Sequence, residues 1–216
     1  MQSNEIKKRI RVVIQQPAFP QYRLPFFKLL SEQENIDLKL YFGKVNSVPN
    51  IESEELYAEY FPTHSLRIKG RDFFTWHKAQ TCFIDKKECD VICFVWNTRF
   101  INLVPALIKA KIKGIHTILW GHGYSKRETG VRKFLRDNIA KLATALVFYD
   151  YHTAENFIKS GWNEKRIFTA PNSLCQNSII KARDKWLNIP KKLYDFKKEN
   201  RLAGRTVAPC STGLPG

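Results

Sequence analysis

Long apolar runs are absent from this sequence. The longest of them, such as residues 91–96, are far shorter than the roughly 20 residues that a helix needs to cross a bilayer. The first ten residues, MQSNEIKKRI, also lack the apolar centre and the small-residue cleavage site of a secretory signal peptide. The sequence therefore predicts a cytoplasmic protein.

Metal-ligand spacings are lacking as well. The five cysteines form no C-x-x-C pair and no cluster with histidine: Cys82, Cys89, Cys93, Cys175 and Cys210. Four histidines share no ligand spacing: His64, His77, His116 and His152. An odd cysteine count in a cytoplasmic chain is typical of reduced thiols, so we predict no disulfide framework and no metal site. Ser125 follows no G-x-S-x-G turn, which leaves a hydrolase triad unsupported.

Acidic residues are scarce in the second half of the chain. Residues 101–216 hold 21 of the 36 basic residues but only 8 of the 20 acidic ones. Such a charge favours an anionic partner: a nucleic acid, an acidic membrane face or a phosphorylated ligand. The alternative is that dispersed lysines only keep the protein soluble. The absence of zinc-finger, RNP, GXXG and helix-turn-helix patterns disfavours the nucleic acid.

Apolar periodicity predicts an α/β chain. Short apolar runs predict strands at residues 10–15, 36–42, 89–96, 115–120, 144–150 and 166–171, and amphipathic segments predict helices at 24–35, 100–114, 127–143 and 153–161. Residues 43–63 are predicted as a long loop with one helical turn, and 65–70 and 73–84 as shorter strands or an edge hairpin. From residue 89 onward strands and helices alternate. We therefore expect a Rossmann-like, mostly parallel sheet with helices on both faces.

Three loops with polar content leave the carboxyl ends of predicted strands, where ligands bind in such sheets. They are residues 16–23, residues 97–99 and the segment Gly121–His122–Gly123. The glycines permit a sharp turn or a close approach to a ligand, and this would project His122 into the crevice. Lys126 and Arg127 lie at the start of the next helix, whose positive dipole end would be near the same opening. Alternatively, His122 is a turn residue whose ring bonds a nearby carbonyl.

Residues 145–174, ALVFYDYHTAENFIKSGWNEKRIFTAPNSL, resemble the end of the N-terminal domain of family 4 glycosyltransferases of the GT-B fold. In both, a strand leads to a short helix, a glycine, a basic residue followed by isoleucine, and a strand ending in Pro-Asn. The resemblance covers residues 9–188 in the order and spacing of elements. It implies one half of a GT-B fold, the half that mainly holds the acceptor, opposite a second domain that binds the nucleotide-sugar.

The resemblance also implies site residues. His122, with Gly121 and Gly123, occupies the place where the family has polar groups facing the donor sugar, and Asn97 and Arg99 would line the same cleft. Many family members have a glycine-rich loop after the first strand. This chain instead has two prolines there, so an anion contact would fall to Gln21, Tyr22 or Arg23; alternatively, this loop selects the acceptor by its shape. The catalytic residues are left open. No metal and no cofactor are expected beyond the nucleotide-sugar as co-substrate.

The chain departs from the family at its end. We predict an acceptor-side domain over residues 1–188, followed by a linker and an unstructured tail over 189–216, where APCSTGLPG replaces an apolar strand. The spaced pair of glutamates in the family's second domain is absent. This pattern indicates a truncated, frame-shifted or split gene whose other half would be a separate partner.

The resulting hypothesis is a glycosyltransferase lineage. It predicts retaining transfer from a nucleotide-sugar to a glycan or lipid-linked acceptor in surface polysaccharide synthesis, with little turnover by this chain alone. A non-catalytic binder of a ligand or partner, and less favourably a nucleic-acid-binding module, remain alternatives. Peripheral contact with the inner membrane face is expected through one basic and aromatic face: Lys126, Arg127, Arg132, Lys133, Phe134 and Arg136. Asp150 is expected to cap the helix that begins near Thr153.

Overall fold

The computed structural model describes residues 9–45, 48–68, 71–124, 129–172 and 176–202. The strands are β1 (Ile10–Gln16), β2 (Ile36–Phe42), β3 (Ala58–Tyr60), β4 (Thr63–Ile68), β5 (Arg71–His77), β6 (Val91–Val95), β7 (His116–Gly121), β8 (Ala145–Phe148) and β9 (Ile167–Thr169). The helices are α1 (Leu24–Ser31), α2 (Ala79–Cys82), α3 (Leu103–Ile112), α4 (Gly130–Leu142), α5 (Tyr151–Lys159), α6 (Asn177–Leu187) and α7 (Pro190–Glu199), with 3-10 turns at Gln21–Arg23 and Glu164–Arg166.

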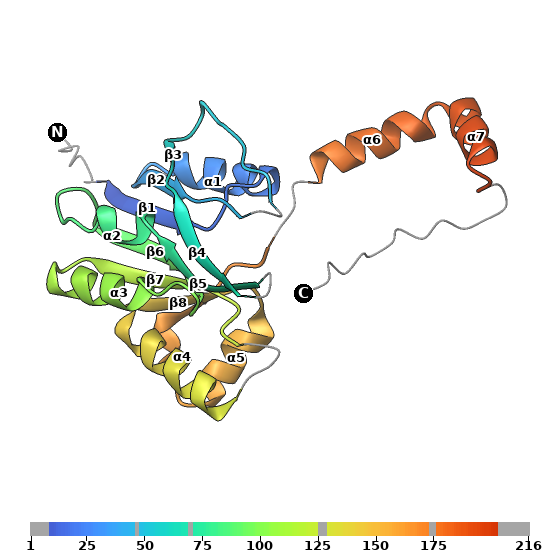
Figure 1. The fold of residues 1–216 in the computed structure, drawn as a ribbon. Coiled ribbons are helices and arrows are strands. Elements are labelled where there is room, and N and C mark those ends of the chain that lie inside the picture. The colour runs from blue at the N-terminus through green and yellow to red at the C-terminus, as the bar shows by residue number, and fades with distance from the viewer. Residues whose placement is uncertain (1–8, 46–47, 69–70, 125–128, 173–175, 203–216) are drawn as a thin grey trace, which may run out of the picture. The chain divides into compact units, whose positions relative to one another are not determined.

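Seven strands form one sheet in the order β3-β2-β1-β6-β7-β8-β9, and all neighbouring pairs are parallel (Figure 1). The chain first builds outward from β1 through β2 to β3, then returns to the other side of β1 with β6. This reversal between β1 and β6 is the topological switch of a Rossmann-like fold. The predicted α/β fold class is confirmed.

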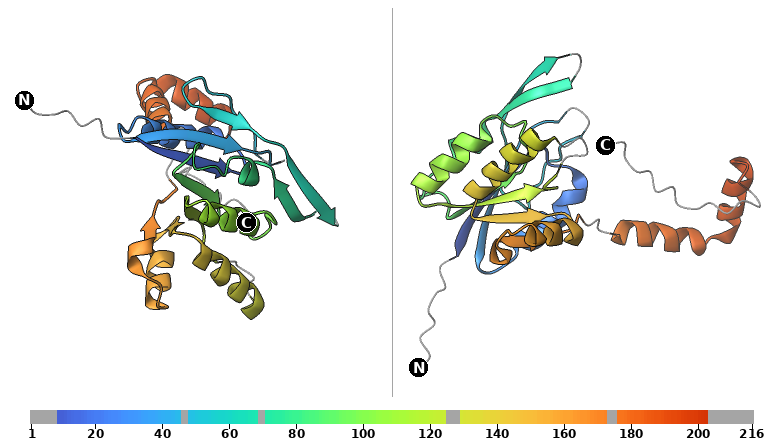
Figure 2. Two further views of the ribbon diagram at one scale, coloured as in Figure 1. Left: turned by 90° about the vertical axis from the view of Figure 1, so that its left-hand side faces the viewer. Right: turned by 90° about the horizontal axis from the view of Figure 1, so that it is seen from below.

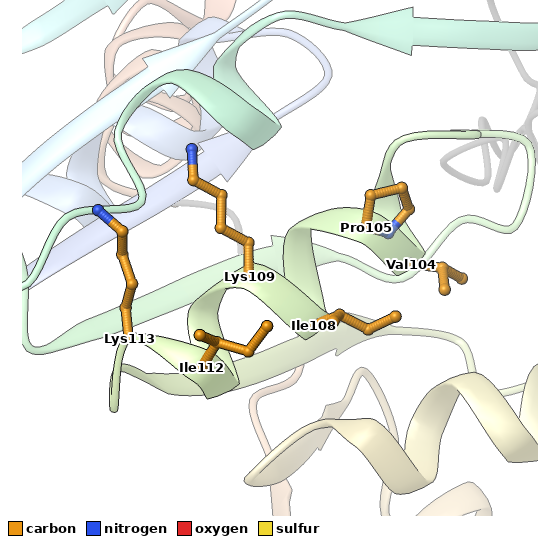
Figure 3. Close-up of a pocket in the computed structure, with 6 residues that line it drawn as sticks. All are labelled: Val104, Pro105, Ile108, Lys109, Ile112 and Lys113. Carbon is orange, nitrogen blue, oxygen red and sulfur yellow. The ribbon is translucent and has the colours of Figure 1, made fainter.

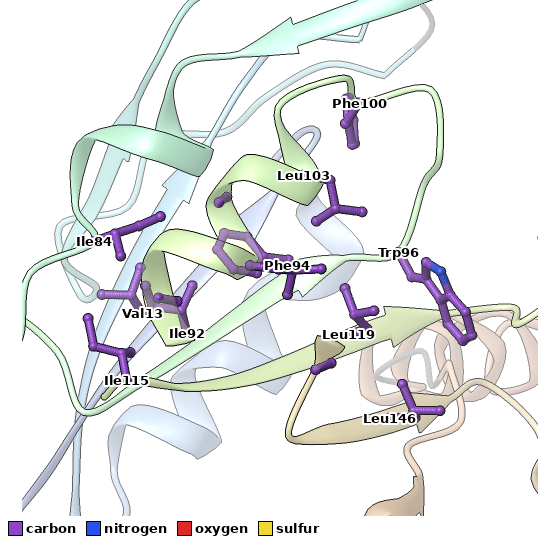
Figure 4. Packing of buried hydrophobic residues seen from close by; sticks show 14 of the residues in the cluster. Val13, Ile84, Ile92, Phe94, Trp96, Phe100, Leu103, Ile115, Leu119 and Leu146 are labelled. Carbon is purple, nitrogen blue, oxygen red and sulfur yellow. The ribbon is translucent and has the colours of Figure 1, made fainter. Parts of the chain in front are cut away.

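Helices cover both faces of the sheet, as predicted. On one face, α3, α4 and α5 pack against alternate residues of β6, β7 and β8, such as Phe94, Leu119 and Leu146 (Figures 1 and 4). On the other face, α1 inserts Phe27, which is fully buried, against the intervening strand residues. Because both faces are covered, the central strands are continuously apolar rather than alternating.

Two short elements correct the sequence prediction. The segment predicted as a loop with one helical turn contains β3 instead, which pairs in parallel with the end of β2. Residues predicted as strand at 79–82 form the single-turn helix α2. The expected hairpin is present: β4 and β5 pair antiparallel and extend as a ribbon beside the main sheet (Figure 2).

Contacts divide the chain into two units, residues 1–173 and 174–216. The second unit contains α6 and α7, and Trp186 of α6 packs against Phe196 of α7 with ring centroids 5.7 Å apart. Helix α7 therefore lies where the sequence predicts a linker and an unstructured tail, because Pro190 opens a helix whose next nine residues lack glycine and proline. Residues 203–216 of that predicted tail lie outside the described residues, and the domain boundary at 188 stays a prediction.

An ion pair between Arg11 and Asp90 connects the start of β1 to the turn before β6. Asp90 accepts hydrogen bonds from Arg11 Nε at 3.1 Å, Arg11 Nη2 at 3.0 Å and the Arg11 backbone N–H at 3.1 Å. These hydrogen bonds from Arg11 hold the pKa of Asp90 well below its ordinary value. The pair joins residues 79 positions apart, across the switch between the two halves of the sheet.

Asp90→Asn should therefore destabilise the fold in a pH-dependent way. A depressed carboxylate pKa stabilises the folded state above the pKa of about 4 in the unfolded chain, and this stabilisation is lost as the pH falls. We expect a loss of about 1–2 kcal/mol at pH 7 that shrinks progressively below pH ~4, measured by urea unfolding. Asp37→Asn, at an exposed carboxylate of β2, is the control. A pH-independent loss in Asp90→Asn would contradict this account.

Candidate functional site

Arg23 lies at the carboxyl edge of the sheet and is held from several sides. Its Nη1 donates to Gln16 Oε1 at 2.8 Å and its Nη2 to Tyr149 Oη at 3.3 Å. The guanidinium carbon stands 5.0 Å from the Trp120 ring centroid, a cation–π distance. Burial disfavours its charge, but the hydroxyls of Tyr149 and Tyr22 outweigh this and raise the pKa of Arg23. The result is a cation fixed in one orientation among three aromatic rings.

The loop that carries Arg23 is rigid. Phe19 is fully buried between Phe27 and Phe42, and its backbone N–H donates to Asn50 Oδ1 at 2.8 Å. The two prolines of this loop fix the backbone without offering N–H groups. Of the three residues predicted to contact an anion here, Gln21 and Tyr22 are exposed and Arg23 is partly buried. A ligand at this edge would therefore meet side chains rather than a backbone cradle.

His122 is exposed directly after β7, and its ring centroid lies 4.6 Å from that of Tyr149. The flanking glycines have a packing reason. A Cβ on Gly121 would lie 2.9 Å from Trp96 Cβ, and one on Gly123 would lie 2.4 Å from Phe148 Cε1. Gly123 also has φ +69°, a conformation that favours glycine. The glycines thus let this turn approach the aromatic core, and this leaves His122 beside Tyr149 at the rim.

A layer of buried polar side chains lies behind this edge. His77 Nε2 lies 3.0 Å from the Gln16 carbonyl oxygen, to which it donates if it carries the proton. Asn102 accepts from the His77 N–H at 3.2 Å and donates to its carbonyl at 2.6 Å. Gln80 Nε2 donates to Gln15 Oε1 at 3.3 Å. All five side chains are at most 1% exposed. Burial lowers the pKa of His77 to about 4, so this imidazole is neutral at pH 7.

Two buried N–H donors near Arg23 have no acceptor among the described residues: Gln16 Nε2 and Trp120 Nε1. An unsatisfied buried donor costs about 1–3 kcal/mol, so such groups are uncommon and mark strained or functional places. Trp120 and Tyr149 were not among the site residues predicted from the sequence, and Gln16 was included there only as the start of the loop at residues 16–23. Two consecutive glutamines at the carboxyl end of a buried strand were the available signal.

Asn97 and Arg99, two other predicted site residues, make their hydrogen bonds within the turn after β6 and with β5. Asn97 Oδ1 accepts from the Arg99 N–H at 3.0 Å within its own turn, and the Arg99 carbonyl accepts from Thr75 of β5 at 2.9 Å. Both therefore belong to the turn that ties β6 to the β4–β5 ribbon. Ser125, Lys126 and Arg127 lie outside the described residues.

The basic face predicted on α4 is divided between two sides of the helix. Phe134 is 68% exposed, whereas Arg136 retains only 9% exposure and faces inward. The prediction that both lie on one face is wrong, because residues two apart in a helix point in different directions. Contact with an anionic membrane stays a prediction. The expected cap is confirmed: Asp150 Oδ1 accepts from the Thr153 N–H at 2.7 Å, which lowers the pKa of Asp150.

A shallow apolar hollow of about 400 Å³ lies on the outer side of α3, away from these residues (Figure 3). Ile108 and Ile112 form its surface. The two lysines that border it are engaged elsewhere: Lys109 donates to the Thr81 carbonyl at 3.1 Å and Lys113 pairs with Asp85 at 3.3 Å. We assign no ligand to this hollow.

Within the described part of the chain, no group of three or more His, Cys, Asp or Glu side chains is arranged to hold a metal ion. No helix there has the length and apolar character needed to cross a membrane.

No protein-family model and no curated protein sequence matches this chain. Among solved structures it is similar to UDP-GlcNAc 2-epimerase from Methanocaldococcus jannaschii, at 17% identity and a TM-score of 0.47 over 76% of this chain and 46% of that one. A UDP-GlcNAc 2-epimerase from Neisseria meningitidis bound to UDP-GlcNAc gives 11% identity and a TM-score of 0.49, over 88% and 54%. The chain thus spans about half the length of these structures. The fold assignment rests on the strand order.

Proposed function

We propose that this chain is the acceptor-side domain of a retaining glycosyltransferase that uses a nucleotide-sugar and a glycan or lipid-linked acceptor. The observation that carries the proposal is the Arg23 cluster at the carboxyl edge of a Rossmann-like sheet, where such folds bind ligands. The ordered resemblance of residues 9–188 to family 4 glycosyltransferases supports the reaction class. A separate domain that holds the nucleotide is part of the proposal.

The cluster suits an anionic sugar substrate. A guanidinium fixed by Gln16 and Tyr149 offers its charge without having to reorganise when a phosphate approaches. The ring of Tyr149, which packs against the buried Trp120, provides apolar surface, and the exposed imidazole of His122 reaches the same rim. In this proposal Arg23 binds a phosphate of donor or acceptor, His122 contacts a sugar hydroxyl, and Gln16 positions Arg23.

Binding of a panel of nucleotide-sugars and of lipid-linked or phosphorylated acceptor analogues, followed by tryptophan fluorescence and calorimetry, tests the proposal. Arg23→Gln should weaken binding at least about tenfold, because it removes a preoriented charged contact worth more than 1.4 kcal/mol. Lys111→Gln, at an exposed lysine near the end of α3, should leave the affinity unchanged. Equal affinities of Arg23→Gln and the unaltered chain, or no binding by the latter, would reject the site.

A non-catalytic binder is the second candidate, since the same cluster would serve it. A transfer assay with nucleotide-sugar and acceptor separates the two. The glycosyltransferase proposal expects turnover to appear only when a second, nucleotide-binding polypeptide is added. A non-catalytic binder would bind its ligand through Arg23 but show no turnover with any combination of nucleotide-sugar, acceptor and second polypeptide.

A further inference from the structure

The outer face of helix α1 is apolar. Phe27 is fully buried against the sheet, whereas Leu29, two positions further along the helix, is 62% exposed. Side chains two positions apart in an α-helix point in nearly opposite directions, so Leu29 lies on the outer side. A helix that covers a sheet normally carries polar residues on this side, and the departure from this pattern calls for a reason.

Two further apolar side chains extend this outer face toward the start of the helix. Tyr22, in the 3-10 turn that leads into α1, is 44% exposed, and Phe26 is 36% exposed. Residues 22, 26 and 29 have the i, i+4, i+7 spacing that lines one side of a helix. We call Tyr22, Phe26 and Leu29 the α1 strip. The basic residue of α1, Lys28, lies outside the strip and pairs with Glu55 at 2.8 Å.

The α1 strip adjoins the Arg23 cluster. Arg23 Nε donates to Tyr22 Oη at 3.3 Å. The Phe26 ring centroid lies 5.5 Å from that of Trp120, and the Arg23 guanidinium stands over the same Trp120 ring. A fixed cation and an exposed apolar surface therefore lie side by side. A ligand that used both would be amphiphilic, with a charged head and an apolar remainder.

The hydrogen-bonding groups of the cluster determine what kind of head group fits. Gln16 Oε1 accepts from Arg23, which fixes the amide and leaves Gln16 Nε2 without an acceptor among the described residues. Trp120 Nε1 is in the same position, and the two side chains are only 1% and 6% exposed. A guanidinium beside two unsatisfied N–H donors favours a head group that is negative and rich in oxygen acceptors, as a phosphate is.

We propose that the acceptor bound by this chain is a lipid phosphate, with its phosphate on Arg23 and its hydrocarbon chain along the α1 strip. A free glycan would place hydroxyl groups against these apolar side chains and gain little from them. A hydrocarbon chain would instead remove apolar surface of Phe26 and Leu29 from water, which stabilises the complex with each methylene that makes contact. This inference rests on the proposed function, because it uses the same cation and selects the lipid-linked acceptor of the two classes named there.

Calorimetry of the full chain with butyl, hexyl, octyl and decyl phosphate, each below its micelle concentration, tests the proposal. The affinity should rise about twofold with each added methylene, half the gain of a fully buried one on a logarithmic scale. Leu29→Ser should weaken decyl phosphate about fivefold and leave butyl phosphate unchanged, because only the longer chain reaches residue 29. Leu66→Ser, at a leucine of β4 that is 58% exposed, is the matched control and should leave all four affinities unchanged.

Arg23→Gln should weaken all four alkyl phosphates by the same factor, since it acts on the head group alone. The lipid assignment is overturned if affinity does not depend on chain length, if Leu29→Ser and Leu66→Ser behave alike, or if octyl glucoside, which has no phosphate, binds as tightly as octyl phosphate. If chain length has no effect while Arg23→Gln still weakens phosphate binding, the lipid assignment fails and the proposed function stands. If Arg23→Gln changes no affinity, both fail together.

Discussion

Replacing Gly123 by alanine is expected to lower the free energy of unfolding by about 3 kcal/mol. The left-handed backbone conformation, φ +69°, costs an alanine about 1–2 kcal/mol. The added Cβ would also stand 2.4 Å from Phe148 Cε1 and 3.1 Å from Phe157 Cε2, inside a packed aromatic group, and overpacking costs about 1–3 kcal/mol. Urea unfolding at pH 7 measures the change.

Two other glycines separate these contributions. Gly161 has φ +88° with open space around its Cβ position, so Gly161→Ala should cost only the backbone part, about 1 kcal/mol. Gly130 opens α4 with open space, and Gly130→Ala should be neutral or slightly stabilising. A Gly123→Ala variant no less stable than Gly161→Ala would mean that the turn does not press against Phe148.

The second large effect concerns pH. Burial lowers the pKa of His77 to about 4, whereas the unfolded chain titrates near 6.5. Below pH ~6.5 His77 therefore binds a proton in the unfolded state, whereas in the folded state it stays neutral until the pH approaches 4. The free energy of unfolding has its full value above this pH. As the pH falls further, it should decrease by about 1.4 kcal/mol per pH unit down to pH ~4, roughly 3 kcal/mol in all.

His77→Gln removes this titration and should flatten the profile between pH ~6.5 and ~4, although it lowers stability at pH 7 through lost packing against Phe100. His116→Gln, at an exposed position of β7, should retain the slope. Urea unfolding at a series of pH values gives both curves. Parallel profiles for His77→Gln and the unaltered chain would contradict the assignment. The Asp90 effect falls below this window and is distinguishable from it.

The main strands and helices were predictable because their signals are local. Apolar runs with glycine breaks mark β6, α3 and β7 without reference to the rest of the chain, and Gly114, with φ +66°, ends α3 as expected. Strand β3 was not predicted because a segment of three residues is too short to show an apolar–polar alternation. These residues form a strand only through their pairing with Leu40–Phe42. Helix α2 is a single turn and offers equally little pattern.

The candidate site was predictable in location but only partly in composition. The strand order brings Arg23 next to Tyr149, which is 126 residues away in the sequence. The sequence around either residue gives no indication of this contact. The glycines beside His122 predict a sharp turn or a close approach to a ligand, and the structure shows that Trp96 and Phe148 pack directly against them. Sequence spacing identifies a sharp turn but not what presses against it.

The strand order has a consequence for biosynthesis. Strands β2 and β3 flank β1 on one side, so that flank is complete once residue 60 has left the ribosome. The other flank begins at Val91, and β6, β7, β8 and β9 then join in the order in which they are translated. Each newly translated strand can pair with an edge strand that has already been made, so the sheet can grow outward from β1 without rearrangement of the strands already paired.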